Sequence, residues 1–262
     1  MITDFKIPIP PVEVQREIVQ LLDQFGGLAT ELTIQLEAEF EARQRQYAYY
    51  RNNLFAFRGG DGVERVPMGK VGEFIRGRRF TKDDVVDKGI PSIHYGEIYT
   101  TYGIAASKAV SHVREDLAPQ LRYAKPGDVV IAAVGETVED VGKAVAWLGT
   151  IDVAIHDDCF LYRSEVLDPK FVSYYLGTDV LNRDKAKYVA RAKMKRLSGD
   201  SLAKLVIPVP SLDEQKRIVA ILDEFEALVT DISAALPAEA NARRKQYEYY
   251  RDRLLTFREL AA

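Results

Sequence analysis

The sequence contains a long internal repeat, with one copy near each end of the chain. Residues 7–25 read IPIPPVEVQREIVQLLDQF, and residues 207–225 read IPVPSLDEQKRIVAILDEF. The match resumes later in each copy, as QYAYYRNNLFAFR at residues 46–58 and QYEYYRDRLLTFR at residues 246–258. All aligned positions are offset by 200 residues, without insertion or deletion. Two copies are too few for a solenoid, which needs at least three repeats, so we expect the copies to pair with each other.

Each copy has the pattern of a capped helix that carries two apolar seams. In the second copy, Pro208 and Pro210 favour an extended lead-in, and Ser211 with Glu214 can form a capping box. The first seam has the spacing 4-3-4-3-4, typical of a left-handed coiled coil. It consists of Ile218, Leu222, Phe225, Val229, Ile232 and Leu236, matched by Ile18, Leu22, Phe25, Ala29, Leu32 and Leu36. The second seam consists of Tyr247, Tyr250, Leu254 and Phe257, matched by Tyr47, Tyr50, Leu54 and Phe57.

An extra four-residue step, a stutter, puts the two seams out of phase. Pro237 falls at this step, so we expect a break or kink there and a first helix of roughly 25 residues, about 37 Å long. Ordinary amphipathic core helices are the alternative interpretation. The near-identical copies favour two helical arms that pack antiparallel. We expect them to form subunit interfaces through Ile18, Leu22, Phe25, Leu32, Tyr47, Tyr50, Ile218, Leu222, Phe225, Ile232, Tyr247 and Tyr250.

The repeat resembles the conserved regions of type I restriction-modification specificity subunits, the HsdS family. The resemblance rests on residues 207–225 and on RRKQYEYYRDRLLTF at residues 243–257, with their counterparts in the first copy. In that family, target recognition domains read DNA and conserved helical regions bind methyltransferase subunits. The resemblance therefore implies a non-catalytic subunit that directs methyltransferase and restriction subunits to a bipartite DNA site. It also implies no cofactor on this chain, and S-adenosylmethionine on the methyltransferase partner.

A full member of that family carries two recognition domains, whereas this chain resembles a half-length form with one. We expect it to pair as a homodimer or with another half-length specificity chain, which would restore two half-sites. The expected fold is α+β, with one globular mixed α/β recognition domain flanked by the two long-helix repeats. The breaker cluster at residues 58–62 gives predicted parts at 1–58, 63–204 and 205–262.

Composition limits the range of functions. The chain has 262 residues, of which 47% are hydrophobic, enough for a real core. Its formal net charge is −3, so any DNA contact must come from local basic patches. A single cysteine, Cys159, excludes an intrachain disulfide and fits a reducing compartment. Because neither a signal peptide nor a membrane-spanning apolar run is evident, we expect a cytoplasmic protein without a membrane partner.

The middle segment has short apolar runs separated by turn signals. We predict mostly antiparallel strands at residues 69–75, 90–95, 128–134, 143–148 and 159–162. A helix should begin with Asp168 as N-cap and Pro169 in the first position, and a second should span residues 180–188. Residues 89–98, 126–131 and 168–176 resemble segments of the family's recognition domains. At His94 the family more often has arginine.

Two basic segments are candidates for DNA binding. The first is a run containing Arg183, Lys185, Lys187, Arg191, Lys193, Lys195 and Arg196, which could neutralise phosphates along a groove. The second contains Arg76, Arg78, Arg79 and Lys82, where Gly77 lets the backbone come close and an arginine can clamp guanine. The alternatives are a solvated surface for the first segment and a basic turn for the second.

Two polar loops could add contacts to base edges. One supplies His94, Tyr95, Glu97, Thr101 and Tyr102, and the other, at residues 136–143, supplies Thr137 and Lys143. Simple hairpin connections are the alternative for both loops.

Catalysis by this chain alone is disfavoured. The sequence lacks an adenine-methyltransferase segment, a glycine motif for S-adenosylmethionine and a Walker A motif. The segment from His156 to Cys159 has too few ligands for a metal site, and the acidic residues 136, 139 and 140 have no distinctive nuclease spacing. The alternative function is a coiled-coil scaffold whose middle domain binds protein, but the basic run favours DNA.

Overall fold

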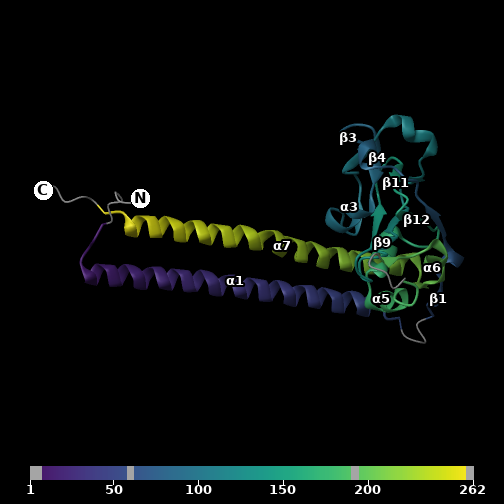
Figure 1. Ribbon diagram of the computed structural model, residues 1–262. Coiled ribbons are helices and arrows are strands. Elements are labelled where there is room, and N and C mark those ends of the chain that lie inside the picture. The colour runs from purple at the N-terminus through teal and green to yellow at the C-terminus, as the bar shows by residue number, and fades with distance from the viewer. Residues whose placement is uncertain (1–7, 58–61, 190–194, 258–262) are drawn as a thin grey trace. The chain divides into compact units, whose positions relative to one another are not determined.

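The computed structural model describes residues 8–57, 62–189 and 195–257, without the side chains of residues 232–234, 236 and 237. The chain divides into two compact units. A helical unit contains Met1–Tyr47 and Glu224–Ala262, and a mixed α/β unit contains Ala48–Asp223. Two long helices, α1 (Val12–Leu54) and α7 (Leu212–Leu255), each contribute residues to both units (Figure 1).

In the helical unit, α1 and α7 pack antiparallel, as the repeat predicts (Figure 1). Phe25 of α1 stacks on Tyr250 of α7, with ring centroids 5.4 Å apart and ring planes inclined by 8°. Leu32 and Tyr247 line the groove between the same two helices. Phe25 and Leu32 belong to the first seam of one copy, and the two tyrosines belong to the second seam of the other. First seam therefore faces second seam, which accounts for two seams in each copy.

The predicted break near Pro237 is wrong, because α7 continues through that residue. The two helices contain 43 and 44 residues, so each is about 65 Å long at 1.5 Å per residue. An internal proline removes one backbone hydrogen bond and costs about 3 kcal/mol. Helix formation is cooperative and most helical stability comes from packing, so a long packed helix can absorb that cost.

The mixed unit is built on two five-stranded sheets. One has the order β2-β12-β8-β10-β5 and the other β3-β6-β4-β11-β7. The strands of the first sheet are β2 (Glu73–Arg76), β12 (Cys159–Arg163), β8 (Val129–Ala132), β10 (Ala144–Trp147) and β5 (Ala105–Ala106). Those of the second are β3 (Val85–Val86), β6 (Ser111–Val113), β4 (Ile90–Ile93), β11 (Val153–Ile155) and β7 (Tyr123–Ala124).

Short strand pairs complete the unit: β1 (Glu64–Pro67) with β14 (Val206–Val209), and β9 (Val134–Gly135) with β13 (Lys195–Arg196). Among the strands that the structure describes, β10–β5 and β11–β4 pair in parallel and the other pairs are antiparallel. The predicted, mostly antiparallel α+β architecture is confirmed.

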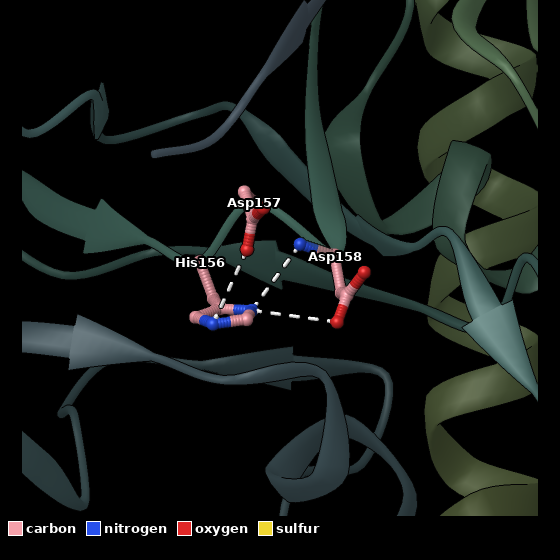
Figure 2. A group of neighbouring side chains, drawn as sticks. All are labelled: His156, Asp157 and Asp158. Atoms are coloured by element: carbon pink, nitrogen blue, oxygen red, sulfur yellow. Dashed lines mark hydrogen bonds and ion pairs between the residues drawn. The ribbon is translucent and has the colours of Figure 1, made fainter. Parts of the chain in front are cut away.

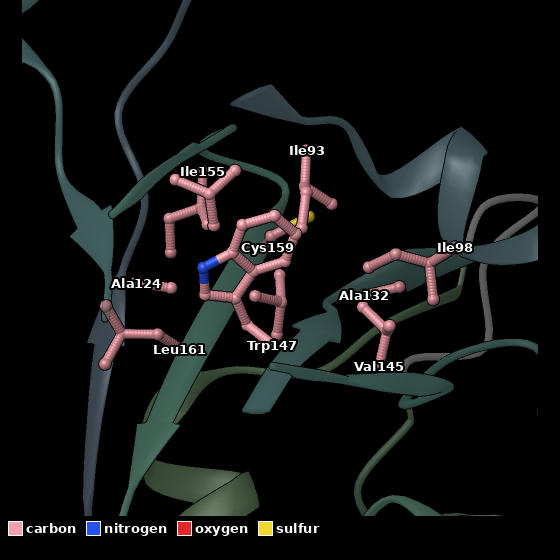
Figure 3. Close-up of a cluster of buried hydrophobic side chains, with 11 residues drawn as sticks. Ile93, Ile98, Ala124, Ala132, Val145, Trp147, Ile155, Cys159 and Leu161 are labelled. Atoms are coloured by element: carbon pink, nitrogen blue, oxygen red, sulfur yellow. The ribbon is translucent and has the colours of Figure 1, made fainter. Parts of the chain in front are cut away.

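A buried cluster joins the two sheets (Figure 3). Trp147 and Leu161 come from the first sheet, and Ile93 and Ile155 come from the second. Cys159 is buried in the same cluster, and burial raises the pKa of its thiol well above the ordinary value, so it packs as a small apolar side chain. Because β11 and β12 belong to different sheets, residues 156–158 link the two sheets.

The helices of the mixed unit begin largely where the sequence predicts. In α4 (Pro169–Leu176), the Asp168 carboxylate accepts from the N–H groups of Lys170 and Phe171 at 2.9 and 3.0 Å. The second predicted helix is shorter, as α5 (Asp179–Lys185). Further short helices are α3 (Tyr95–Thr100), α6 (Gly199–Lys204), η1 (Lys82–Asp84) and η2 (Glu115–Gln120).

The predicted strand at residues 69–75 is half wrong, because its first part forms the helical turn α2 (Met68–Val71). At Gly69, a Cβ would lie 2.8 Å from the Cβ of Ala203 in α6. The two short helices therefore pack backbone against side chain at this position, a contact that the local sequence pattern does not reveal.

The second repeat enters the mixed unit through the buried side chain of Gln215. Its amide donates to the carbonyls of Val166 and Pro210 at 3.0 and 2.9 Å, and accepts from the Asp168 N–H at 2.7 Å. The matching residue in the first repeat, Gln15, repeats the contact to its own proline, with the amide 2.7 Å from the Pro10 carbonyl, but is exposed. The same lead-in geometry is therefore used in both copies, and the second copy adds contacts to the body.

This difference predicts unequal effects of one substitution in the two copies. Gln215→Ala leaves the Asp168 N–H and two carbonyls without their partner, so we expect a loss of about 1–3 kcal/mol in the free energy of unfolding. Gln15→Ala should change the stability of the isolated chain by less than about 0.5 kcal/mol. Denaturant unfolding of both variants measures the difference. Equal losses would contradict the assigned role of Gln215.

Candidate nucleic-acid interface

Basic side chains from separate segments meet in one open pocket of the mixed unit, which we call the arginine groove. Its volume is about 440 Å³. It is lined by Arg76, Arg79, Phe80, Thr81, Lys82, His94, His156, Asp157, Asp158 and Arg196. These residues come from the end of β2 and the segment up to η1, from the start of α3, from the 156–158 turn and from β13. Five predicted DNA-binding residues therefore lie together.

The 156–158 turn carries the His156 ring and two carboxylates close together (Figure 2), and the carboxylates pair with two arginines. Arg76 donates from Nε to the Asp157 carbonyl at 2.8 Å, and its Nη2 lies 3.7 Å from the Asp157 carboxylate. The Nη1 atom of Arg196 lies 3.2 Å from the Asp158 carboxylate. The turn thus fixes one arginine on each of its two aspartates.

The His156 ring lies between the two carboxylates and is buried. Its Nδ1 accepts from the Asp158 N–H at 3.2 Å, and its Nε2 lies 3.1 Å from the Phe80 carbonyl. When the ring is neutral, this network places its proton on Nε2. The ring also meets the edge of Phe80, with centroids 4.9 Å apart. His156 therefore holds the segment before η1 against the turn.

Ligand atoms of His156, Asp157 and Asp158 lie within 4.8 Å of one another, a spacing that a metal ion could use. Both ring nitrogens already face hydrogen-bond partners, and the carboxylates face Arg76 and Arg196. The residues present therefore favour guanidinium groups, rather than a metal ion, as the cations at this turn.

Gly77 has a different role from the predicted one. The sequence suggests a glycine that lets the backbone approach DNA, but Gly77 is buried against the turn. A Cβ there would lie 2.1 Å from the His156 carbonyl oxygen and 2.4 Å from that of Ile155. Its N–H donates to the Cys159 carbonyl at 3.0 Å. Gly77 thus brings the end of β2 against the turn, while Arg78 beside it is exposed.

His94 lies in the groove and caps α3. Its Nδ1 accepts from the Gly96 N–H at 3.2 Å, and the Glu97 carboxylate accepts from the His94 N–H at 2.9 Å. Glu97 also accepts from the Ser111 hydroxyl. The predicted base-contacting carboxylate of Glu97 is therefore engaged in the capping box. Burial, followed by the charge of His156, lowers the pKa of His94 below its ordinary value.

The second predicted loop makes its polar contacts internally. Asp140 accepts from the Thr137 hydroxyl at 2.8 Å and pairs with Lys143 at 2.9 Å. The hydrogen bond from Lys143 lowers the pKa of Asp140. Beneath this loop, Lys185 is fully buried and donates to the Val141 carbonyl at 2.7 Å. Burial lowers the pKa of Lys185 to about 8.

Lys185 therefore fits neither interpretation of the basic run, phosphate binding or a solvated surface, because it is buried and supports the 136–143 loop from inside. Lys187 pairs with Asp184 at 2.8 Å, and Lys195 is half-buried in β13. Arg191 and Lys193 lie outside the described residues.

The sequence matches the model of the family described as "Type I restriction modification DNA specificity domain" over residues 1–42 and 60–242. The chain belongs to this family. It is 30% identical to the "Type I restriction enzyme EcoR124I/EcoR124II specificity subunit" of Escherichia coli, over 96% of this chain and 63% of that protein. It is 32% identical to the "Putative type I restriction enzyme specificity subunit S.HindORF215P" of Haemophilus influenzae, with the same coverage. The chain thus spans less than two thirds of these relatives.

Solved structures share the fold of this specificity-domain chain. One, titled "Structural basis underlying complex assembly and conformational transition of the type I R-M system", has a TM-score of 0.74 at 22% identity. The HsdS subunit from Thermoanaerobacter tengcongensis has a TM-score of 0.60 at 21% identity. Each match covers 95% of this chain and 60% of the solved chain. None of the helices within the described residues contains an apolar stretch of the length that a membrane span requires.

Three further predicted DNA-binding residues of this specificity-domain chain, Tyr95, Thr101 and Tyr102, are not part of the groove lining. Tyr95 and Tyr102 are half-buried against the core cluster, and the Tyr102 hydroxyl accepts from the Val110 N–H at 2.9 Å. Thr101 is exposed. Sequence reasoning missed Asp157 and Asp158, although an acidic pair directly before a buried strand could have suggested partners for arginines.

The predicted subunit-interface residues differ in exposure. Ile218 and Leu222 are fully buried and Ile18 is nearly so, which means that this chain covers them itself. Leu22, Leu32, Tyr47, Phe225 and Tyr247 are half-buried, Phe25 and Tyr50 are exposed, and the side chain of Ile232 lies outside the described part.

The lowered pKa of His94 predicts a pH dependence of stability. The unfolded chain protonates this ring near pH 6.5, whereas the folded chain retains the neutral form, so stability falls as the pH drops through that value. We expect the free energy of unfolding to decrease from about pH 7 to about pH 5.5. His94→Asn keeps an N-cap acceptor without a titrating ring and should flatten this part of the profile.

Denaturant unfolding at several pH values measures both profiles, with His112→Asn as a histidine control outside the groove. An unchanged slope in His94→Asn, or an equal flattening in His112→Asn, would contradict the assignment.

Proposed function

We propose that this chain recognises a DNA sequence for a type I restriction-modification complex. The supporting observation is the arginine groove, where Arg76, Arg79, Lys82 and Arg196 converge beside His94. Arginine can bind the O6 and N7 atoms of guanine bidentately, and lysine can neutralise phosphate. The chain carries a net charge of −3, so the attraction for DNA would be local to this groove. Membership of the specificity-domain family supports the same function.

The proposed partners are double-stranded DNA, methyltransferase subunits and restriction subunits. We propose that the complex acts in the cytoplasm, where the DNA is. Methyl transfer and cleavage would belong to those subunits, with S-adenosylmethionine bound by the methyltransferase and no cofactor on this chain. The arms would carry the subunit contacts, and the mixed unit would select the sequence.

We further propose that the first repeat binds a second recognition unit. In the second repeat, Gln215 holds the start of α4, and Asp223 accepts from Lys170 and from the Tyr174 hydroxyl, the latter at 2.7 Å. The first repeat carries the matching Gln15 and Asp23 on an open pocket of about 680 Å³. Val19 on this surface is 57% exposed, whereas its counterpart Val219 is 8% exposed. The first repeat therefore offers the same docking residues uncovered.

The second recognition unit must present its own α4 surface uncovered. In a copy of this chain, that surface already holds the copy's α7, so a homodimer would pair through the arms or exchange α7. Two-fold pairing of copies would make the DNA target an interrupted palindrome, because both half-sites would be read by the same residues. Gln15→Ala would weaken such docking while the isolated chain stays folded.

The groove predicts which substitutions weaken DNA binding. Arg79→Ala should lower affinity for the target duplex by about 1–3 kcal/mol if its contact to guanine is bidentate. Lys82→Ala should weaken binding to all duplexes and reduce the salt slope by about one. Fluorescence anisotropy with the methyltransferase present, over a range of salt concentrations, measures both effects on duplexes selected from a random library.

Lys125→Ala is the matched control. Lys125 is exposed in the turn before β8. This turn adjoins the end of the β8–β12 pair where Val129 faces Tyr162, whereas Cys159 and the 156–158 turn lie at the opposite end. Equal losses in the control and the groove variants would contradict the placement of DNA in the groove. Failure of the wild-type chain to bind any duplex would instead favour a scaffold whose mixed unit binds protein.

A further inference from the structure

We infer that Asp157 and Asp158 are specificity-determining positioning residues, which hold Arg76 and Arg196 for base reading and oppose indiscriminate phosphate binding in the groove. This inference rests on the proposed function in DNA recognition. The inference explains why two acidic residues line a groove in which DNA phosphates would favour positive charge.

The arginines are restrained and still accessible. Arg76 is held by the Asp157 carbonyl at 2.8 Å and by its carboxylate at 3.7 Å, and Arg196 is held by the Asp158 carboxylate at 3.2 Å. Their side chains are 54% and 58% exposed. The guanidinium groups therefore have donors left for a ligand, in positions that the aspartates set.

The aspartates are themselves held more firmly than the arginines. Their side chains are 31% and 21% exposed, and both lie against the buried ring of His156. The Asp158 carbonyl accepts from the Ala133 N–H at 2.8 Å, which ties the turn to the end of β8. The carboxylates are thus fixed by backbone and ring contacts that do not depend on the arginines, as positioning groups must be.

The charges of the aspartates favour discrimination over affinity. A phosphate entering the groove meets the attraction of Arg76, Arg79, Lys82 and Arg196 and the repulsion of two carboxylates. A guanine edge presents neutral acceptors, so it gains the arginine contacts with little of that repulsion. Repulsive elements of this kind raise specificity by weakening the wrong complex. An arginine with one side held by a carboxylate also loses less conformational entropy on binding.

The test uses Asp157→Asn and Asp158→Asn in the full chain with its methyltransferase partner. Both substitutions keep the side-chain shape and remove one negative charge. Affinities are measured for a target duplex selected from a random library and for a scrambled duplex of the same composition. We expect non-target affinity to rise roughly fivefold per substitution, the size of one contact between unit charges in water. Target affinity should stay level or fall, so the target to non-target ratio should drop at least about fivefold.

Two further variants separate charge from position. Asp152→Asn makes the same charge change at an exposed residue between β10 and β11, outside the groove lining, and should leave the ratio unchanged. Asp158→Glu keeps the charge but moves it, so non-target affinity should stay at the wild-type level while target affinity falls.

The inference is overturned if the Asn variants lose target and non-target affinity together, as a purely structural role predicts, or if Asp152→Asn changes the ratio equally. A wild-type chain without any sequence preference would overturn the proposed function and this inference together. A wild-type preference that survives in both Asn variants would overturn the inference alone.

Discussion

The candidate site depends on one close backbone contact, the packing of Gly77 against the turn that links the two sheets. A Cβ at this position would lie 2.1 Å from the His156 carbonyl oxygen, far inside any tolerated distance, so only glycine fits. The contact brings the end of β2 to the turn between β11 and β12, and with it Arg76 to Asp157. His156 then fixes the next segment through the Phe80 carbonyl. A basic groove with set side-chain positions follows from backbone packing rather than from the charges alone.

The helical arms and the local caps could be predicted from the sequence because they depend on short-range pattern. Heptad spacing, the two seams and the Asp168 N-cap are all properties of neighbouring residues. The error at Pro237 has a physical origin: a proline penalty is local, whereas the stability of a long packed helix is shared among many residues. The position of Pro237 therefore did not predict the length of the helix.

The groove could be predicted only in part. Arg76, Arg79, Lys82 and Arg196 stand out by charge, but their meeting depends on the pairing of strands far apart in sequence. Arg76 and Asp157 are 81 residues apart, so nothing local marks them as partners. Lys185 differs in the other direction. A lysine within a basic run is expected to be exposed to solvent, but the fold buries Lys185 under the 136–143 loop. Local runs of basic residues therefore indicated the kind of surface, and tertiary contacts decided which of these residues lie together in the groove.

The proposed function places DNA in the arginine groove. Hydrogen–deuterium exchange of the unmodified full chain, measured with and without a selected target duplex, shows which segments the DNA covers. DNA in the groove should slow exchange in the segments around residues 76–82, 94–97 and 195–198 and leave exchange unchanged at residues 125–128, in the turn before β8. Protection confined to residues 125–128 or to the helical arms, with no change in the groove segments, would show that DNA binds elsewhere.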